Sequence, residues 1–458
     1  MVESKRMDLK NKRVLVVGLG KSGVSAALYL RKLGARVTVS DARSSEALAK
    51  EIPALLDAGV MVETGGHGVL TFRRQDLIVI SPGVPLTTPD VQRSISAGVP
   101  LIGELELASQ GLRGQVIAIT GSNGKTTTTS LVGHILEHAG LDTKVGGNIG
   151  LPVVELVEAS TDETWSVLEV SSFQLETIDT FRPHIAAVLN ITPDHLDRHG
   201  TFENYAAAKT RITENQTSDD FLVLNAEDKP TQMVAAKTKA QIYWFSGVRR
   251  IKQGAFAHAD GIYFIAKEGG TPEPIMPLAE VSLRGAHNVE NVLAAIAMAK
   301  LAGVSAEAIR SGVASFHAVE HRLQFVAKVR GVDYYNDSKA TNVDATAKAL
   351  ASFSGGVRII LGGKDKGSDY TTLLPLLHER AVAVYTIGAA AEIIEAQIGE
   401  QVTITRAGTM AIAVRMASES AQPGETVLLA PACASFDQFE NYEHRGRVFT
   451  ELVQALSK

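Results

Sequence analysis

The sequence of 458 residues lacks several features that mark particular protein classes. It has a single cysteine, Cys433, so no disulfide can form within the chain, and we expect a reducing compartment, with the cytoplasm as the default. The N-terminal segment MVESKRMDLKNK is polar, and the apolar run RVLVV that follows is too short for a signal sequence or a membrane span. We therefore expect a cytoplasmic protein without membrane insertion.

The chain also lacks an excess of charge of either sign. Lys and Arg total 45 against 50 Asp and Glu, a formal net charge of -5, so no basic surplus exists to neutralise a phosphate backbone. Nucleic acid is therefore not expected as a partner. Hydrophobic residues make up 45% and charged residues 21%, which is close to the globular average and excludes wholesale disorder and a coiled-coil rod.

Short apolar runs alternate with longer amphipathic stretches along nearly the whole chain. This alternation predicts βαβ units and largely parallel sheets, an α/β fold. At about 150 residues per domain, the length predicts roughly three domains. The pattern begins anew near Glu104 and Glu320, so we place domains over 1–103, 104–318 and 319–458. Strands are expected over RVLVV, RVTV, DLIVIS, QVIAIT, WSVLEV, IAAVLN, FLVLN, VDYYN, VRIILGG, AVAVYTIG, VTIT and ETVLLAP, with hairpins in 254–277.

A glycine-rich loop, GLGKSG, follows the first predicted strand and opens a helix. Its glycines are Gly18, Gly20 and Gly23, and Asp41 ends the next strand. Glycines let a backbone approach a pyrophosphate at a helix N-terminus, and an acidic residue in this place can hold a sugar hydroxyl. The loop predicts binding of a nucleotide or a nucleotide-sugar. The alternative is that the glycines serve only tight packing of helix against strand.

A second loop, TGSNGKT, lies between a predicted strand and a helix. Lys125 can neutralise β- and γ-phosphate charge, backbone N–H groups can cradle the oxygens, and the Thr126 hydroxyl can ligate Mg²⁺. The strict P-loop pattern has a glycine where this chain has Ile119, so the match is a shorter variant. We predict ATP binding, against the alternative of an ordinary helix N-terminus with a solvated lysine. Two nucleotide sites indicate an enzyme that joins or transfers groups rather than a dehydrogenase.

Polar side chains follow two predicted strands of the middle domain. Glu169 ends WSVLEV, where open α/β sheets place ligands, and it could hold Mg²⁺. Asp194, His195 and Asp197 follow IAAVLN and offer hard oxygen donors and one imidazole. The alternative for Asp194 and Asp197 is a helix cap or a turn. Lys209 lies on an expected amphipathic helix, and its spacing alone gives it no role.

Three loops follow strands of the last predicted domain and are expected on one edge of its sheet. They are NDSKATN, LGGKDKGSD and APACASFDQF. Lys339, Thr341, Lys366 and Ser435 would give that edge a cationic, hydroxyl-rich pocket for a small carboxylate substrate. We interpret Cys433 as a packing residue, because no neighbour in sequence lowers its pKa.

Taken together, these loops resemble the Mur ligases over essentially the whole chain. The motifs occur in the order GLGKSG, SPG, TGSNGKTT, GGNIG, EVSSFQLE, NITPDHLDRH, AAKTRI, GAHNVEN, HRLQ, NDSKATN, LGGKDKG and PACASFDQF. The central motifs are shared with the related folylpolyglutamate synthases, whereas the first and last sets imply the members that add D-glutamate. The resemblance implies an N-terminal Rossmann-like domain for a UDP-sugar, a central P-loop ATPase-type domain and a C-terminal Rossmann-like domain for the incoming amino acid.

The resemblance also implies which residues form each site. The UDP-sugar would lie among Gly18, Gly20, Lys21, Ser22, Asp41, Arg43, Ser81, Gly83, Asn148 and Gln174. ATP would be bound by Gly121, Asn123, Gly124, Lys125, Thr126, Thr127, Asn288, Asn291, Arg322 and Asp337. D-Glutamate would be surrounded by Lys339, Thr341, Lys366, Ser435, Phe436 and Tyr442. Tyr442 stands where many relatives have phenylalanine.

The implied activity is an ATP-dependent amide ligase of peptidoglycan precursor synthesis. It would add D-glutamate to UDP-N-acetylmuramoyl-L-alanine through an acyl phosphate, as a monomer with small-molecule substrates only. The resemblance implies four catalytic residues, Lys125, Glu169, His195 and Lys209. It also implies that Mg²⁺ is held by Thr126, Glu169, His195 and a CO₂-derived carbamate on Lys209. A carbamate is an anionic oxygen ligand, whereas the ammonium of an unmodified lysine would repel the ion.

Three alternatives stay open. Another Mur ligase, or a folylpolyglutamate synthase-like ligase, would take a different amino acid, although folate ligases usually lack the N-terminal GLGKSG unit. A non-catalytic nucleotide-gated binding module would release no ADP with any substrate pair. An NAD-dependent oxidoreductase would bind nicotinamide and need no ATP.

Overall fold

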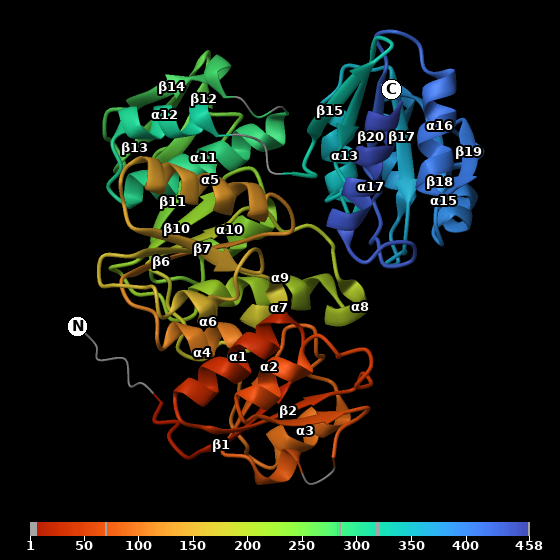
Figure 1. Ribbon diagram of the computed structural model, residues 1–458. Coiled ribbons are helices and arrows are strands. Elements are labelled where there is room, and N and C mark those ends of the chain that lie inside the picture. Colours follow the sequence, from red (N-terminus) through yellow and green to blue (C-terminus); the bar gives the residue numbers. More distant parts are fainter. Residues whose placement is uncertain (1–6, 69–70, 282, 284, 317–319, 457–458) are drawn as a thin grey trace. The chain divides into compact units, whose positions relative to one another are not determined.

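The computed structural model describes residues 7–68, 71–281, 283, 285–316 and 320–456. These residues form three β-sheets of five, nine and six strands (Figure 1). The boundary predicted at residue 318 lies outside the described residues. The chain divides into two compact units, which we describe separately. The first unit comprises Met1–Ile191, Glu203–Met276 and Leu293–Val313, and the second comprises Thr192–Phe202, Pro277–Val292 and Ala314–Lys458.

The first sheet is parallel throughout, in the order β3-β2-β1-β4-β5. Its strands are β1 Arg13–Val17, β2 Arg36–Asp41, β3 Met61–Thr64, β4 Leu77–Ile80 and β5 Leu101–Gly103. The residues of β4 are all buried apolar ones, as expected for a parallel strand covered on both faces. The strands predicted at RVLVV, RVTV and DLIVIS are confirmed, whereas the short strands β3 and β5 were not predicted.

Four helices accompany the first sheet. They are α1 Lys21–Lys32, α2 Ile52–Asp57, α3 Pro89–Ser96 and α4 Glu104–Ser109. α1 ends where Gly34 takes a φ of +82°, a left-handed conformation that favours glycine and stops the helix.

The nine-stranded sheet has the order β14-β13-β12-β11-β10-β9-β6-β8-β7. The pairs from β7 to β12 are parallel, and β12 pairs antiparallel with β13, which confirms the predicted hairpin. The strands are β6 Gln115–Thr120, β7 Thr143–Gly147, β8 Trp165–Glu169, β9 Ile185–Val188, β10 Phe221–Asn225, β11 Gln241–Ser246, β12 Gly254–His258, β13 Gly261–Ile265 and β14 Glu273–Pro277.

The helices of this region differ in part from the prediction. The helix expected near Tyr205–Asn215 begins earlier and stops at Thr210, and the one expected from Asn291 begins at Ala286. The helices are α5 Lys125–His138, α6 Val153–Leu156, α7 Ser172–Leu175, α8 Leu196–His199, α9 Phe202–Thr210, α10 Lys229–Ala235, α11 Ala286–Leu301 and α12 Ala306–Ser315. No helix within the described residues has the length and apolar character needed to cross a bilayer.

The six-stranded sheet lies in the second unit, in the order β15-β16-β20-β17-β18-β19. Only β15 runs antiparallel among the pairings described, and the adjacent strands β16, β20 and β17 run parallel. The loops after these three strands therefore share one edge, as predicted. The strands are β15 Gln324–Val329, β16 Val332–Asn336, β17 Val357–Gly362, β18 Ala381–Ile387, β19 Ile404–Gly408 and β20 Thr426–Leu429.

Helices cover this sheet, and its core consists mainly of their apolar faces and the strands. The strand predicted at VTIT was placed too early, because β19 extends to Gly408. The helices are α13 Val343–Ala351, α14 Leu374–Arg380, α15 Ala391–Ile398, α16 Met410–Ser420 and α17 Tyr442–Ala455.

Candidate active site

A cavity of about 550 Å³ in the first unit brings the GLGKSG loop together with segments of the nine-stranded sheet. All ten residues predicted for the UDP-sugar line it, although they are scattered between positions 18 and 174. The lining residues are Gly18, Leu19, Gly20, Lys21, Ser22, Asp41, Arg43, Ser81, Pro82, Gly83, Val84, Gly147, Asn148, Gly150, Pro152 and Gln174.

The three glycines of the first loop differ in backbone conformation and in the space around them. Gly18 has a φ of +90°, and a Cβ on Gly23 would lie 1.9 Å from the carbonyl oxygen of Gly18. Both positions are therefore explained by backbone conformation and by packing of helix against strand. Gly20 has an ordinary φ of -71°, and a Cβ there would meet nothing within 4 Å. Gly20 is the N-cap residue of α1, a position that favours glycine, and the space beside it is open.

Asp41, at the end of β2, organises this loop. Its Oδ2 accepts the backbone N–H of Leu19 at 2.7 Å and Nη2 of Arg43 at 2.8 Å, while its Oδ1 accepts Nε of Arg43 at 3.0 Å. Burial opposes ionisation of Asp41, but these hydrogen bonds and the Arg43 charge prevail and hold its pKa at about 2. The carboxylate is thus anionic at neutral pH and fixes both the loop and Arg43 beside the cavity.

The opposite wall of the cavity comes from the segments after β7 and β8. Nζ of Lys21 donates to the carbonyl of Gly150 at 2.6 Å, which links α1 to that wall. Nδ2 of Asn148 donates to Oε1 of Glu169 at 2.8 Å. Gln174 forms a reciprocal capping box with Ser171, so its side chain is held in place at the start of α7. Asn148 and Glu169 connect this cavity to the second loop.

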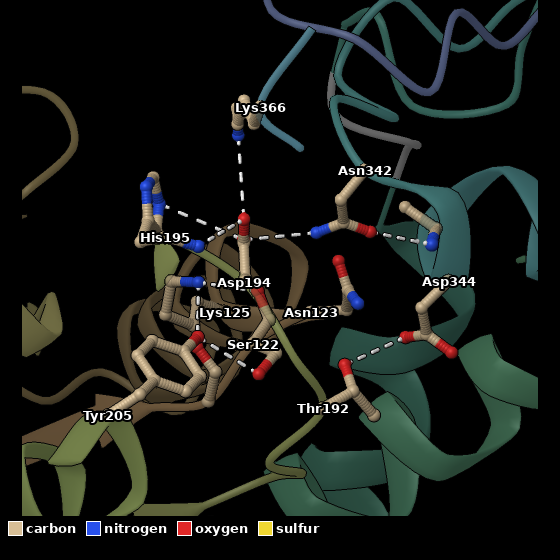
Figure 2. Close-up of polar contacts among 12 residues, drawn as sticks. Ser122, Asn123, Lys125, Thr192, Asp194, His195, Tyr205, Asn342, Asp344 and Lys366 are labelled. Carbon is tan, nitrogen blue, oxygen red and sulfur yellow. Dashed lines mark hydrogen bonds and ion pairs between the residues drawn. The ribbon is translucent and has the colours of Figure 1, made fainter. Parts of the chain in front are cut away.

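The TGSNGKT loop leads from β6 into α5. Gly124 precedes α5 with a φ of +84°, and Nζ of Lys125 donates to the carbonyls of Gly121 and Ser122, each at 2.8 Å (Figure 2). Asn123 is held by Asn190, whose Oδ1 accepts its backbone N–H at 2.8 Å and whose Nδ2 donates to its carbonyl at 3.1 Å. Asn190 was not predicted, because nothing in its local sequence points to a contact with a loop so far away.

Thr126 and Glu169 lie together beneath this loop. The Thr126 hydroxyl donates to Oε2 of Glu169 at 2.7 Å, and Glu169 is 1% exposed. A hydroxyl and a carboxylate are hard oxygen donors of the kind that Mg²⁺ takes, so these two residues fit the ion. Within the described residues no three His, Cys, Asp or Glu side chains gather into a metal-binding group.

Lys209, on α9, lies beside the same loop and is 2% exposed. Its Nζ donates to the carbonyl of Gly121 at 2.8 Å and lies 4.7 Å from the ring centroid of Tyr205. The Tyr205 hydroxyl in turn contacts Oγ of Ser122 at 2.9 Å (Figure 2). The structure thus brings Lys125, Glu169 and Lys209 together in the first unit, whereas His195 belongs to the second unit.

In the second unit, Asp194 is held by residues of the six-stranded sheet domain. Nδ2 of Asn342 donates to its Oδ2 at 3.1 Å, and Nζ of Lys366 lies 3.5 Å from its Oδ1 (Figure 2). Nε2 of His195 lies 3.7 Å from Oδ2 of Asp194, and His195 has a left-handed backbone with a φ of +53°. Asp197 lies in the first turn of α8. Here Asp194 pairs with Lys366, a residue that we predicted for the amino acid.

The six residues predicted for D-glutamate all lie in the second unit, on loops at one edge of its sheet and at the start of α17. Nζ of Lys339 lies 3.7 Å from the ring centroid of Tyr442, so the tyrosine supports the lysine where a phenylalanine would also serve. Ser435 is buried, whereas Phe436 is 68% exposed. Thr341 and Lys366 occupy the loops after β16 and β17.

Arg445 is a residue of this region that the sequence interpretation missed. It is fully buried, and its guanidinium donates to Oγ and the carbonyl of Ser338 at 2.9 and 2.7 Å and to the carbonyl of Cys433 at 3.1 Å. Burial lowers its pKa to about 10. Arg445 therefore ties α17 to the loops after β16 and β20. The available signal was its place one helical turn before the buried Phe449 of α17.

The remaining residues predicted for ATP lie in the second unit. Nδ2 of Asn291 donates to Oδ1 of Asn288 at 3.0 Å near the start of α11. Burial raises the pKa of Asp337 to about 6, although the Arg322 charge and the N–H of Leu323 favour its ionised form. Asp337 and Arg322 are thus close enough to influence each other.

Cys433 is a packing residue, as interpreted from the sequence. Its side chain is fully buried, its sulfur lies 2.9 Å from the Tyr370 hydroxyl, and burial raises the pKa of the thiol to about 11. A thiol with a raised pKa carries little of the reactive thiolate at neutral pH.

Three family models match the chain in succession. Residues 12–103 match the model described as Mur ligase MurD-like, N-terminal domain. Residues 119–299 match the Mur ligase middle domain, and residues 321–433 match the Mur ligase glutamate ligase domain.

Curated relatives match over nearly the full length. The chain is 63% identical over 449 residues to a protein of Acidobacterium capsulatum named UDP-N-acetylmuramoylalanine--D-glutamate ligase, covering 98% of this chain and 97% of the relative. It is 60% identical over 452 residues to a protein of the same name from Koribacter versatilis, covering 99% of each.

Solved structures with the same fold are more distant in sequence. A UDP-N-acetylmuramate-alanine ligase from Thermotoga maritima matches with a TM-score of 0.61 at 19% identity, covering 97% of this chain and all of the other. A pseudomurein peptide ligase type C from Methanothermus fervidus matches with a TM-score of 0.62 at 19% identity, with the same coverage. At this identity the likeness shows the three-domain α/β fold and nothing further.

Proposed function

Since the chain belongs to the Mur ligase family, we propose that it is the ATP-dependent ligase that joins D-glutamate to UDP-N-acetylmuramoyl-L-alanine in peptidoglycan precursor synthesis. The observation that carries this proposal is the 63% identity to a relative of that name over 98% of the chain. The geometry supports it, because the first loop lines a cavity of about 550 Å³ and the second places Lys125 at the start of a helix, where it would meet phosphate groups.

The chemistry follows from the reactants. A carboxylate is a poor electrophile because its charge repels nucleophiles and oxide is a poor leaving group. The alanyl carboxylate therefore takes the γ-phosphoryl group of ATP to give an acyl phosphate and ADP. The amine of D-glutamate then attacks the acyl carbon, phosphate leaves, and the amine loses a proton. The protein contributes positioning, charge compensation and exclusion of water.

Individual residues have distinct parts in this proposal. Lys125 would neutralise phosphate charge, and Thr126 and Glu169 would hold Mg²⁺, which supplies further charge neutralisation when bound. We also keep His195 and a carbamate on Lys209 as proposed magnesium ligands. Lys209 is buried and its Nζ contacts the carbonyl of Gly121 in the second loop, so a carbamate on it would be an anionic oxygen ligand at that loop.

The second-unit residues complete the proposed sites. Lys339, Thr341 and Lys366 would bind the carboxylates of D-glutamate, with Ser435, Phe436 and Tyr442 beside them. Asn288, Asn291, Arg322 and Asp337 would contact ATP. We also propose domain boundaries at about 103 and 318, a monomer in solution and a cytoplasmic location, with small molecules as the only partners.

The decisive experiment is phosphate release from ATP in the presence of UDP-N-acetylmuramoyl-L-alanine. We expect release with D-glutamate and little with L-glutamate, L-alanine or diaminopimelate. Preferential release with one of the other amino acids would instead identify another Mur-type ligase, and stimulation by a folate substrate a folylpolyglutamate synthase-like enzyme. No release with any pair would overturn the ligase assignment.

A further inference from the structure

Helix α4 carries two buried glutamates whose partners lie in another part of the first unit. α4 follows directly from β5, the edge strand of the first sheet, and lies beside α1 and α6 (Figure 1). Glu104 is 2% exposed and Glu106 is fully buried. A buried carboxylate is costly unless hydrogen bonds compensate it, so the partners of these two side chains indicate what they stabilise.

Glu104 holds the start of α6. Its Oε1 accepts the backbone N–H of Val154 at 2.8 Å, and Oε2 has no hydrogen-bond partner among the residues that the structure describes. Pro152, directly before α6, lines the cavity, and Gly150 is held from the other side by Lys21. Glu104 and Lys21 therefore fix the two ends of one segment of the cavity wall.

Glu106 holds the segment after α7 in the same way. Its Oε2 accepts the backbone N–H groups of Asp179 at 2.8 Å and Phe181 at 2.9 Å, and both of its oxygens accept that of Thr180 at 3.0 Å. This segment follows the helix that places Gln174 in the cavity wall. Thus one short helix beside the first sheet holds the backbone next to both segments that supply the opposite wall.

We propose that Glu104 and Glu106 are positioning residues that set the width of the UDP-sugar cavity by holding α6 and the segment after α7 against the first sheet. The inference rests on the proposed function, which assigns a UDP-sugar to this cavity. Neither glutamate lines the cavity, so both act through the backbone of its wall. Their loss should change the affinity for UDP-sugar and leave the second loop at Lys125 unaffected.

The test compares KM values for UDP-N-acetylmuramoyl-L-alanine and ATP, and kcat, in Glu104 variants. Glu104→Ala leaves the N–H of Val154 without an acceptor, and we expect KM for the UDP-sugar to rise about tenfold while kcat and KM for ATP stay within about twofold. Glu104→Gln keeps an oxygen facing Val154 and should restore most of the affinity. If Glu104→Ala does not fold, Glu104→Asp, whose shorter side chain withdraws the oxygen, should show the same rise.

Asp220→Asn is the matched control. Asp220 is another buried carboxylate of the first unit, which accepts the backbone N–H of Thr217 at 2.8 Å and pairs with Arg182 at 2.7 Å, and it does not line the cavity. We expect this variant to lower Tm without changing KM. A Glu104→Ala variant that likewise lowers Tm and leaves KM unchanged would overturn the proposal and show a purely structural role.

Calorimetric binding of UDP-N-acetylmuramoyl-L-alanine separates this proposal from the proposed function. If the wild-type protein binds the ligand and Glu104→Ala binds it equally well, the positioning role is wrong and the ligase assignment stands. If the wild-type protein neither binds the ligand nor releases phosphate, the proposed function is wrong and the inference fails with it.

Discussion

The two glycine loops of the first unit begin in the same way, since each leaves a parallel strand and enters a helix, yet they present different groups. Beside the first loop, Asp41 at the end of β2 accepts hydrogen bonds from Leu19 and Arg43 and so fixes the loop at the edge of the cavity. The second loop places Lys125 beside Thr126, whose hydroxyl reaches Glu169. The comparison teaches that two connections of the same strand-to-helix kind differ in backbone conformation and in neighbouring side chains, and we propose that these differences decide between binding and chemistry.

The largest expected effect is a loss of turnover from a substitution in the second loop, which distinguishes the role of that loop from the role of the first. Lys125→Ala removes the cation that would balance the transferring phosphoryl group, and we expect kcat to fall about a thousandfold. The Kd for UDP-N-acetylmuramoyl-L-alanine, measured by calorimetry, should stay within about twofold of the wild-type value. Lys21→Ala, at the first loop, should do the reverse and weaken UDP-sugar binding more than turnover. Loss of both properties in Lys125→Ala would contradict the division between binding and chemistry.

Two substitutions in the first loop test why glycine stands at positions 20 and 23. Gly23→Ala places a methyl group against the Gly18 carbonyl, and we expect it to lower the free energy of unfolding by about 3 kcal/mol or more. Gly20→Ala has open space and should change stability by less than about 0.5 kcal/mol, while weakening UDP-sugar binding about tenfold. Urea unfolding measures the change in stability, and calorimetry measures the binding of the UDP-sugar. Unchanged UDP-sugar binding in Gly20→Ala would mean that no ligand approaches that glycine.

The last prediction concerns the wall opposite the first loop and depends on pH. Burial, and to a lesser degree the Glu155 charge, raise the pKa of Glu104 from an ordinary 4.5 to about 7. The folded protein then binds this proton more tightly than the unfolded chain does. The contribution of Glu104 to stability is therefore complete below pH 4.5 and falls by up to about 3 kcal/mol as pH rises to about 7.

Glu104→Gln does not titrate, so its free energy of unfolding should improve relative to wild type between pH 5 and pH 8. Urea unfolding at the two pH values measures this difference. A constant difference between the two proteins would mean that Glu104 titrates near its ordinary pKa.

Much of the fold could be predicted because parallel strands covered on both faces appear as continuous apolar runs. QVIAIT and FLVLN match β6 and β10 residue for residue. The short strands β3 and β5, Met61–Thr64 and Leu101–Gly103, escaped prediction because three or four residues carry little periodic signal. The late end of β19 is set by its pairing with β18, which local sequence does not record.

The residues of the candidate site likewise fall into those that the sequence predicted and those that it missed. Lys125 and Glu169 were predicted from their position in the chain, because one follows a glycine loop and the other ends a strand, and their roles remain predictions. Asn190 and Arg445 were missed, because each stabilises a loop through hydrogen bonds to backbone atoms that are distant in sequence. Glu104 and Glu106 were missed for a related reason, since two glutamates in a helical stretch are ordinarily a solvated face.

The sequence by itself determined most of the longer strands and which glycines, lysines and carboxylates follow them, because hydrophobic periodicity and turn chemistry are local properties. Only the tertiary structure decided which of those groups share a cavity and which buried carboxylates hold its wall. The physical reason is that hydrogen bonds such as that from Val154 to Glu104 join residues that the chain keeps 50 positions apart, and only packing of the sheets brings them within reach.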